Sequence, residues 1–211
     1  MGYTKLDMET FPRRLHFDFF KAMEMPHLGI TANVDVTDLL KFCKEHKYSF
    51  YLVFMHAAAL AANSIPELRQ RILGDGVVEY DDCPTSHTEL QEGGTFCYCT
   101  LHHNMPFDQY IVDAEERRQR SRTSQGLGVE PDKLGQLFTT TVPWVHYTSL
   151  QQPLEHPLDS NPRIAWGKFQ ADHAGRLQMP VTLMAHHALV DGVHLGMFYQ
   201  NLEQEMKKII G

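Results

Sequence analysis

The sequence predicts an α/β fold, an α+β sandwich in which a mixed β-sheet is flanked by helices. Three observations lead to this fold class: strand-like and helix-like segments alternate along the chain, one long helix is apolar almost all round, and the chain closes with apolar residues at helical spacing. A chain of 211 residues with 43% hydrophobic content can bury one substantial core. We therefore expect a single domain over residues 1–211.

The first half of the chain contains one clear strand and two clear helices. Residues 32–36, "ANVDV", alternate between apolar and polar side chains as a half-buried strand does. Residues 37–46 follow as a short helix that opens with Thr37 as its cap. Residues 50–65, "FYLVFMHAAALAANSI", are apolar on nearly every side, which is typical of a helix in a central, buried position.

The middle of the chain alternates between strands and one further helix. Residues 74–82 contain a Gly-Asp-Gly turn before a strand, and residues 87–103 contain two strands on either side of a glycine pair. Residues 107–126 are typical of an amphipathic helix that runs into a polar loop.

The last third of the chain combines strands with a closing helix. Residues 136–150, 163–170 and 176–187 are strand candidates. From Val193 onward, apolar residues recur at the spacing of one helix face, namely Met197, Phe198, Leu202, Met206, Ile209 and Ile210. The chain therefore closes with a packed helix.

Charge and composition exclude several classes of partner. The formal charge of −7, from 19 basic and 26 acidic residues, provides neither a basic stripe for nucleic acid nor a polybasic membrane anchor. No apolar stretch approaches the roughly 18 residues that a membrane span requires, and the first residues lack a secretory segment. We expect a cytoplasmic protein with a small-molecule partner. Its cysteines are too few and too irregular for a disulfide scaffold, so we expect reduced thiols at Cys43, Cys83, Cys97 and Cys99.

The segment "MAHHALVDGVHLGMF", residues 184–198, concentrates chemically capable side chains at a strand-to-helix junction. His186 and His187 end a strand and Asp191 precedes a helix, so these side chains lie at the rim of the sheet. Neighbouring strand residues face opposite ways, so the two histidines cannot serve one pocket in the same manner.

Three interpretations of this segment remain open from its residues alone. As a metal site, it offers His194 as a further donor, but the two adjacent histidines diverge and the zinc-protease spacing is absent, so we expect no metal. As ordinary structure, it is a strand end followed by a helix cap. As a catalytic segment, it provides an imidazole that titrates near neutral pH and can remove a proton from a hydroxyl.

The segment "HHALVDGVH" resembles the His-His-x-x-x-Asp-Gly signature of the acyl-CoA-dependent acyltransferases, and in particular of the chloramphenicol acetyltransferases. Further stretches are similar to that family in the same order along nearly the whole chain, namely "GYTKLDMETFPRRLHFDFF", "FYLVFMHAAALAANSIPELRQRI", "DGVVEYDD", "TELQEGGTF" and "TVPWVHYTSL". The resemblance implies an acetyl-CoA-dependent O-acetyltransferase that acts on chloramphenicol or a similar hydroxylated small molecule.

The resemblance also implies roles for individual residues. His187 matches the general base that takes the proton of the acceptor hydroxyl. Asp191 and Arg13 match an ion pair that holds the turn and so orients the imidazole; without that match, Asp191 is a helix cap and Arg13 a surface charge. Thr140 stands where the family places a serine whose hydroxyl donates to the oxyanion, or else it is only a β-branched strand residue.

The acceptor and donor sites follow from the same resemblance. The residues expected to form the acceptor pocket are Phe19, Phe20, Phe96, Leu150 and Ala165. The aromatic residues Tyr147 and Trp144 are expected to line the same cleft. Three of these depart from the family, since Phe20 replaces a tyrosine, Leu150 an aromatic residue and Ala165 a threonine, which puts chloramphenicol in doubt as the best acceptor. Lys168 and Phe169 match a lysine-aromatic pair beside coenzyme A, although a solvated strand lysine is the plain alternative.

The resemblance finally implies a homotrimer with three active sites at the subunit interfaces, because one chain forms only one wall of the site. A dihydrolipoyl acyltransferase is less favoured, since no lipoyl or subunit-binding segment precedes the domain. The alternatives that remain are an acyltransferase of the same fold for another hydroxylated acceptor, and a non-catalytic or metal-binding trimer that uses its 13 histidines.

Overall fold

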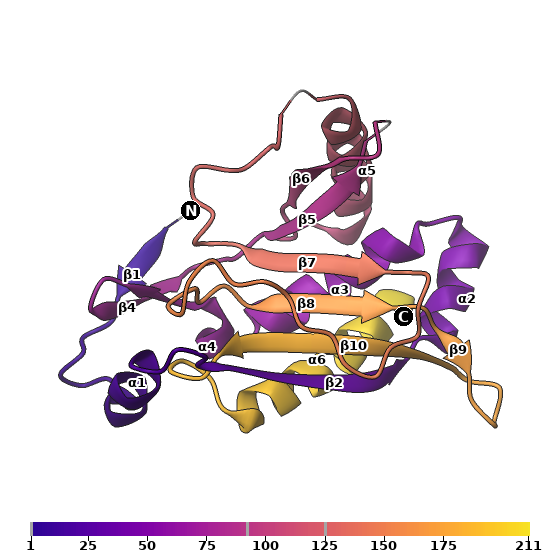
Figure 1. The fold of residues 1–211 in the computed structure, drawn as a ribbon. Helices are drawn as coiled ribbons and strands as arrows, with labels where there is room; N and C mark the ends of the chain where they lie inside the picture. Colours follow the sequence, from indigo (N-terminus) through magenta and orange to yellow (C-terminus); the bar gives the residue numbers. More distant parts are fainter. Residues whose placement is uncertain (1, 92, 125) are drawn as a thin grey trace.

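A computed structural model describes residues 2–91, 93–124 and 126–211, and within them the chain forms one large and one small β-sheet with six helices (Figure 1). The large sheet has, in spatial order, the strands β2 (His27–Asp35), β10 (Leu177–His186), β8 (Arg163–Gly167), β7 (Leu137–Val142), β5 (Thr85–Leu90) and β6 (Phe96–Leu101), while β9 (Gln170–Ala171) pairs with β10. Strand β7 is parallel to both of its neighbours, and the other pairs are antiparallel. The mixed sheet predicted from the sequence is therefore confirmed.

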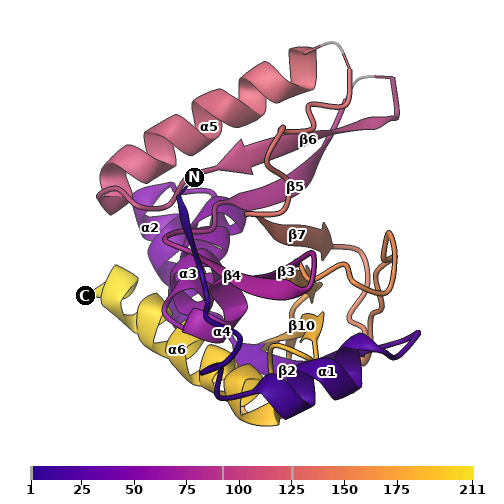
Figure 2. The same ribbon diagram turned by 90° about the vertical axis from the view of Figure 1, so that its left-hand side faces the viewer.

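The four longest helices lie on one face of the large sheet. Figures 1 and 2 show α3 (Phe50–Asn63) and α6 (Gly192–Ile210) packed behind its strands, with α2 (Thr37–His46) beside them and α5 (Phe107–Thr123) behind β5 and β6. The side chain of Trp166 faces this layer, because its ring packs against Phe54 of α3 with the ring centroids 5.1 Å apart. Residues next to Trp166 in β8 therefore point to the opposite side of the sheet.

The opposite side carries a row of residues that define what we call the open face. Successive cross-strand partners in this row are Thr31 of β2, Thr182 of β10, Ala165 of β8 and Thr140 of β7. Figure 1 looks onto this face, and no helix covers it there. The protein thus has a helical layer on one side of its sheet, while the other side has no helix over it in Figure 1 but has part of its row, Ala165 and Thr182, buried.

The remaining elements surround the end of the sheet at which β10 finishes and β2 begins. Helix α1 (Arg14–Lys21) lies there, next to a small antiparallel sheet in the order β1 (Tyr3–Lys5), β4 (Gly76–Tyr80) and β3 (Gln70–Leu73), and α4 (Pro66–Arg69) precedes β3 (Figure 2). The turn between β3 and β4 places Gly74 at φ +62°, a conformation that glycine adopts without strain. The hairpin predicted at residues 74–82 is therefore confirmed.

Some local predictions were wrong in detail. Thr37 is the first helical residue of α2 rather than its cap, and the Asp35 carboxylate accepts the Thr37 backbone N–H at 2.9 Å and the Thr37 hydroxyl at 2.6 Å. The strand expected at residues 136–150 ends at Val142, because the chain then folds back onto the end of β8.

All four cysteines are buried and free. In the described ranges, no helix combines the length and apolarity that crossing a membrane requires.

Candidate active site

The junction between β10 and α6 brings the two adjacent histidines into different surroundings. Strand β10 ends at His186, and the chain turns there because the backbone N–H groups of Leu189 and Val190 both donate to the His186 carbonyl, at 3.0 and 3.2 Å. The backbone N–H of His187 donates to the carbonyl of Pro26 at 2.8 Å. This bond fixes the start of the turn to the segment that precedes β2.

The imidazole of His187 is held in one orientation. Its Nδ1 lies 2.8 Å from the carbonyl oxygen of Val190 and 3.3 Å from Oδ1 of Asp191, and its ring stacks on Phe20 with the centroids 3.8 Å apart. A carbonyl oxygen only accepts hydrogen bonds, so Nδ1 carries the proton and donates it. Nε2 of the neutral ring is then an acceptor, and among the described residues it has no hydrogen-bond partner. The His187 side chain is 30% exposed, so Nε2 is available to a bound molecule.

His186 is buried and fully engaged with the backbone. Its Nδ1 accepts the N–H of Ala188 at 3.1 Å, and its Nε2 donates to the carbonyl of Pro157 at 3.1 Å. Burial, with the nearby His27 adding to it, lowers the pKa of His186 to about 4. At neutral pH this ring is therefore uncharged, and it serves to hold the chain. The surroundings of His186 thus differ from those of His187, as the strand alternation predicted.

An ion pair joins the start of α1 to the start of α6. The guanidinium of Arg13 binds the Asp191 carboxylate with both terminal nitrogens, Nη2 lying 2.9 Å from Oδ1, and Nη2 also donates to the His187 carbonyl at 3.2 Å. These hydrogen bonds from Arg13 hold the pKa of Asp191 below its usual range. The ion pair expected from the sequence is therefore present.

Asp191 is at the same time the N-cap residue of α6, so the two interpretations offered for it hold together. Its backbone N–H donates to Nδ1 of His194 at 2.8 Å, and Nε2 of His194 lies 3.6 Å from a carboxylate oxygen of Glu67. Arg13, in contrast, is not a solvated surface charge, because its side chain is only 15% exposed.

Thr140 lies far from His187 within one chain. Thr140 is separated from Thr182 by one intervening strand, and His187, one residue beyond the end of β10, follows Thr182 by five residues. At standard strand spacing and rise, these steps add up to roughly 20 Å between Thr140 and His187. One chain therefore cannot place both side chains on one reacting group.

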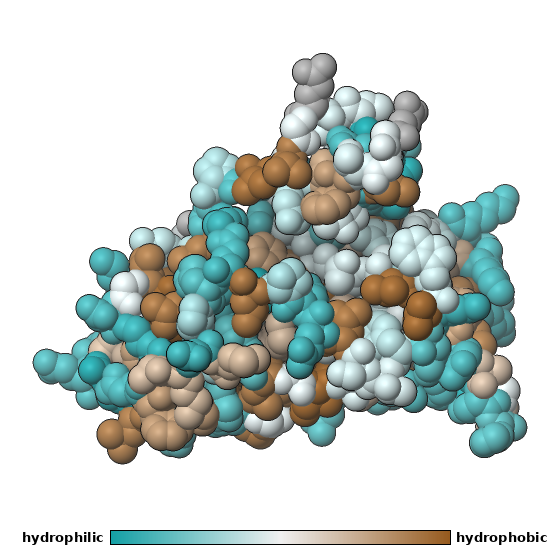
Figure 3. Space-filling model, in the orientation of Figure 1, coloured by the Kyte–Doolittle hydropathy of each residue, from teal (hydrophilic) through white to brown (hydrophobic). Residues whose placement is uncertain are grey.

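The residues expected in the acceptor cleft are likewise spread over the open face. Phe19 and Phe20 lie on α1 at one end, whereas Phe96 lies on β6 at the far edge of the sheet. Ala165 is fully buried in the middle row, and Leu150 follows β7 in a loop, half-buried. Figure 3 shows this face, on which apolar side chains form separate patches among polar ones. Trp144 is largely exposed on the same loop as Leu150.

Lys168 and Phe169 follow β8 at the end of the sheet opposite to His187. Phe169 packs edge-on against Phe50, the first residue of α3, with the ring centroids 6.1 Å apart, and Lys168 is exposed. The first backbone N–H groups of a helix attract anions, and so does an exposed ammonium group. This corner therefore suits a phosphate-bearing ligand with a flat ring.

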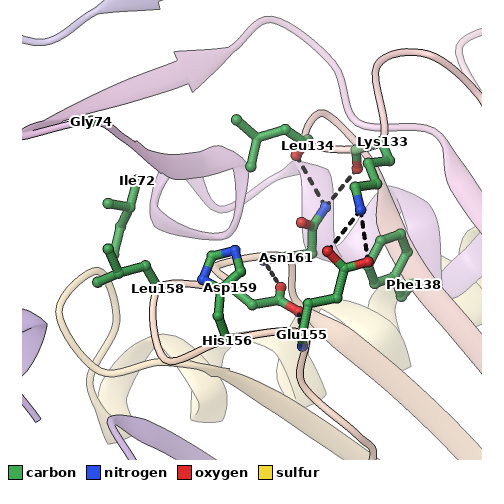
Figure 4. Close-up of a pocket in the computed structure, with 10 residues that line it drawn as sticks. All are labelled: Ile72, Gly74, Lys133, Leu134, Phe138, Glu155, His156, Leu158, Asp159 and Asn161. Atoms are coloured by element: carbon green, nitrogen blue, oxygen red, sulfur yellow. Dashed lines mark hydrogen bonds and ion pairs between the residues drawn. The ribbon is translucent and has the colours of Figure 1, made fainter. Parts of the chain in front are cut away.

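The depression in Figure 4 is distinct from both of these places. It has a volume of about 230 Å³ and contains an ion pair between Lys133 and Glu155 at 2.7 Å and an amide, Asn161, that donates to the Leu134 carbonyl at 3.0 Å. It is lined by Ile72, Gly74, Lys133, Leu134, Phe138, Glu155, His156, Leu158, Asp159 and Asn161. Neither His187 nor Thr140 reaches it. Across the described ranges, no three His, Cys, Asp or Glu side chains are grouped as metal ligands.

Two features of the site had no signal in the sequence. The stacking of Phe20 on His187 restrains the ring from the side, and the phenol of Tyr147 reaches the open-face row, where it accepts a hydrogen bond from Thr182 at 3.4 Å. Both contacts join segments more than thirty residues apart, which no local pattern in the chain reveals.

Comparison with known proteins identifies similar chains over nearly the full length. Residues 1–203 match the family model described as "Chloramphenicol acetyltransferase". The chain is 30% identical over 209 residues to chloramphenicol acetyltransferase 3 of Escherichia coli and 24% identical over 217 residues to chloramphenicol acetyltransferase 2 of Haemophilus influenzae; these alignments cover 97% and 100% of both chains.

Solved structures give the same picture. A chloramphenicol acetyltransferase structure, 28% identical, superposes with a TM-score of 0.85 over 97% of this chain and 100% of that one. A probable dihydrolipoamide acetyltransferase from Listeria monocytogenes superposes with a TM-score of 0.70 over 98% of this chain and 94% of that one, at 18% identity, which is evidence of a common fold only.

Proposed function

The chain belongs to the chloramphenicol acetyltransferase family and is an acyltransferase, and from this premise we propose that it transfers the acetyl group of acetyl-CoA to a hydroxyl of chloramphenicol or of a similar small molecule. The observation that carries the proposal is the state of His187: its Nδ1 donates to the Val190 carbonyl, and its Nε2, which has no partner among the residues that the structure describes, is a base at the surface. A neutral imidazole in this state is suited to accept a proton from an alcohol.

The reaction has two steps that balance around this nitrogen. In the first, Nε2 of His187 takes the proton of the acceptor hydroxyl while the hydroxyl oxygen bonds to the thioester carbon, and the carbonyl oxygen becomes an oxyanion. In the second, the carbonyl re-forms, the carbon–sulfur bond breaks, and the leaving thiolate takes the proton from His187. The products are the acetyl ester and free coenzyme A, and the imidazole is regenerated.

Arg13 and Asp191 act in this proposal as positioning residues. Asp191 Oδ1 lies on the Nδ1 side of His187, and Arg13 binds both the carboxylate and the His187 carbonyl. The pair therefore restrains the backbone and the ring together, and the negative charge near Nδ1 stabilises the imidazolium formed in the first step. Phe20 restrains the other face of the ring by stacking.

Thr140 donates to the oxyanion in this proposal, but from another copy of the chain. The roughly 20 Å between Thr140 and His187 within one chain, at standard sheet spacing, requires His187 of one subunit to face the open face of the next. A closed ring of three such contacts forms a homotrimer with three equivalent sites. The acceptor then lies between the α1 end of one subunit, with Phe19 and Phe20, and the open face of its neighbour, with Phe96, Leu150 and Ala165.

We place acetyl-CoA at the corner that contains Lys168 and Phe169. Phe169 can stack on the adenine ring, and Lys168 with the first turn of α3 can attract phosphate. We place the reaction in the cytoplasm, where the four free, buried cysteines stay reduced. The acceptor itself is defined here as a class, a small molecule with an accessible hydroxyl and apolar surface.

The test is coenzyme A thiol release by the purified protein with acetyl-CoA and a panel of hydroxylated acceptors that includes chloramphenicol. We expect acceptor-dependent thiol release that His187→Ala abolishes and that the matched control His173→Ala, an exposed histidine beyond β9, leaves unchanged. Release with other acceptors but not with chloramphenicol would favour the alternative of a different hydroxylated substrate. No acceptor-dependent release with any member of the panel would contradict the proposal.

A further inference from the structure

Three hydroxyl groups form a continuous chain on the open face. The Thr31 and Thr182 hydroxyl oxygens are 2.7 Å apart, and the Thr182 hydroxyl donates to the phenol oxygen of Tyr147 at 3.4 Å. Thr31 and Thr182 belong to the same cross-strand row as Ala165 and Thr140. The hydroxyl chain therefore leads across the sheet toward Thr140, and Ala165, with its short side chain, separates the two.

Tyr147 reaches this row because the chain folds back after β7. The backbone N–H of Lys168 donates to the Val145 carbonyl at 2.8 Å, which holds the returning segment against the end of β8. The ring of Tyr147 covers Gly167, where an added Cβ would lie 2.9 Å from the Cδ1 atom of the ring. Since Gly167 and Ala165 are two residues apart in one strand, they share the open face. The phenol therefore lies beside Ala165 on the side of Thr182, and Thr140 lies on the other side of Ala165.

The direction of the hydrogen bonds leaves one proton unused. Each hydroxyl has a single hydrogen, so when Thr182 donates to Tyr147 it accepts from Thr31. In the described part of the chain, the phenol proton of Tyr147 then finds no acceptor. A hydroxyl that already accepts a hydrogen bond is a stronger donor. Burial also raises the pKa of Tyr147, so the phenol keeps its proton at neutral pH.

We propose that the Tyr147 hydroxyl is a second hydrogen-bond donor, alongside Thr140, to the carbonyl oxygen of the reacting thioester. The inference rests on the proposed acetyl transfer and deepens it. The phenol and Thr140 flank Ala165 from opposite sides, so in this proposal the thioester carbonyl oxygen lies between the two hydroxyls and accepts from both. The bond strengthens as negative charge develops on the oxygen, so Tyr147 acts on the transition state more than on binding.

The first test is Tyr147→Phe, which removes the hydroxyl and keeps the ring that covers Gly167. We expect kcat to fall by about 10-fold or more, while KM for acetyl-CoA changes by less than about 3-fold and the melting temperature stays close to wild type. The matched control is Tyr199→Phe in α6. Its hydroxyl bonds the same two strands from the helical side, at 2.7 Å to the Ile30 carbonyl and 2.9 Å to that of Val181. We expect this control to lose stability without the fall in kcat.

The second test uses the middle of the hydroxyl chain and does not depend on Tyr147→Phe folding well. Thr182→Val should lower kcat by several-fold and Thr182→Ser should restore it, because only the serine keeps a hydroxyl that can donate to Tyr147. Packing at Thr182 alone would give the opposite ranking, since valine matches the volume of threonine better than serine does.

The outcomes separate this inference from the function on which it rests. If wild-type protein transfers acetyl groups and Tyr147→Phe retains kcat within about 2-fold, below the loss expected for an oxyanion donor, the assignment of Tyr147 is wrong and the function stands. A raised KM at unchanged kcat would also overturn it, because the phenol would then serve ground-state binding only. If the wild-type protein releases no thiol with any acceptor, the function itself fails and the role of Tyr147 fails with it.

Discussion

Arg13 and Asp191 form a two-pronged ion pair that also includes the backbone of His187, since the Arg13 guanidinium donates to the His187 carbonyl at 3.2 Å. The two residues are 178 positions apart in the sequence. This pair ties the start of α1 to the start of α6, and Phe20 stands near the other end of α1. Asp191 approaches the imidazole of His187 at Nδ1, while Arg13 holds the His187 backbone carbonyl.

Removing either partner of the pair should impair acetyl transfer, and removing both should cost much less than the sum. Arg13→Ala leaves the Asp191 carboxylate without its cation, and Asp191→Ala leaves a mostly buried guanidinium unpaired, so each single change carries a penalty that the double change avoids. The measurement is a double-mutant cycle on kcat/KM and on the free energy of unfolding. Strictly additive losses would show that the contact does not couple the two residues.

His186→Ala should leave partial acetyl transfer and lower the stability of the protein. The His186 ring bonds the backbone of Ala188 and Pro157 and has no part in the proposed proton transfer, so its loss disconnects the loop before β8 from the turn. We expect a drop in melting temperature together with residual kcat, measured beside the His187→Ala protein. Complete loss of activity in a folded His186→Ala trimer would reverse the roles proposed for the two histidines.

Mixed trimers should test whether each site is shared between two subunits. His187→Ala removes the base, and Thr140→Val removes the proposed oxyanion donor from the open face with little change in packing, so each variant alone should be nearly inactive. Mixed rings contain one interface that joins an intact His187 to an intact open face, so co-expression in equal amounts should restore up to about a quarter of the wild-type sites. A site within one chain would give no restoration. The oligomeric state is checked in parallel by sedimentation.

Thr140→Val should lower kcat by roughly 100-fold, the general scale for losing one oxyanion donor, whereas Thr140→Ser should preserve or improve it. Valine fills nearly the same volume as threonine in β7, so packing should change little. The measurement is kcat and the KM for acetyl-CoA with a good acceptor. Wild-type turnover in the valine variant would mean that Thr140 is only a strand residue.

Acid should destabilise the fold through its buried histidines. Burial lowers the pKa of His56 to about 4, with the nearby His103 adding to the effect, and that of His186 to about 4. The unfolded chain binds protons at these histidines near their ordinary value of about 6.5, so stability is complete above that pH and declines as pH falls toward 4. Unfolding measured between pH 7.5 and 4.5 should show this slope, and His56→Gln should reduce it. An unchanged slope in this variant would show that His56 does not contribute.

The sequence by itself determined the local elements and the chemistry available at the turn. The apolar character of residues 50–65 on nearly every side predicted α3 as a buried helix, and the apolar repeat every three to four residues after Val193 predicted α6 as a helix packed along one face. The adjacent histidines and the following Asp191 were visible as a strand-to-helix junction, and strand alternation alone predicted that His186 and His187 differ.

Only the tertiary structure decided which of these groups meet. The N-cap position of α2 is Val36 instead of Thr37, and the carboxylate of Asp35, at the end of β2, accepts the Thr37 backbone N–H. The separation of Thr140 from His187, the stacking of Phe20 and the hydroxyl chain to Tyr147 all depend on strand order and register. The physical reason is that local periodicity constrains neighbouring residues only, whereas these contacts join segments that the sheet brings together across long stretches of chain.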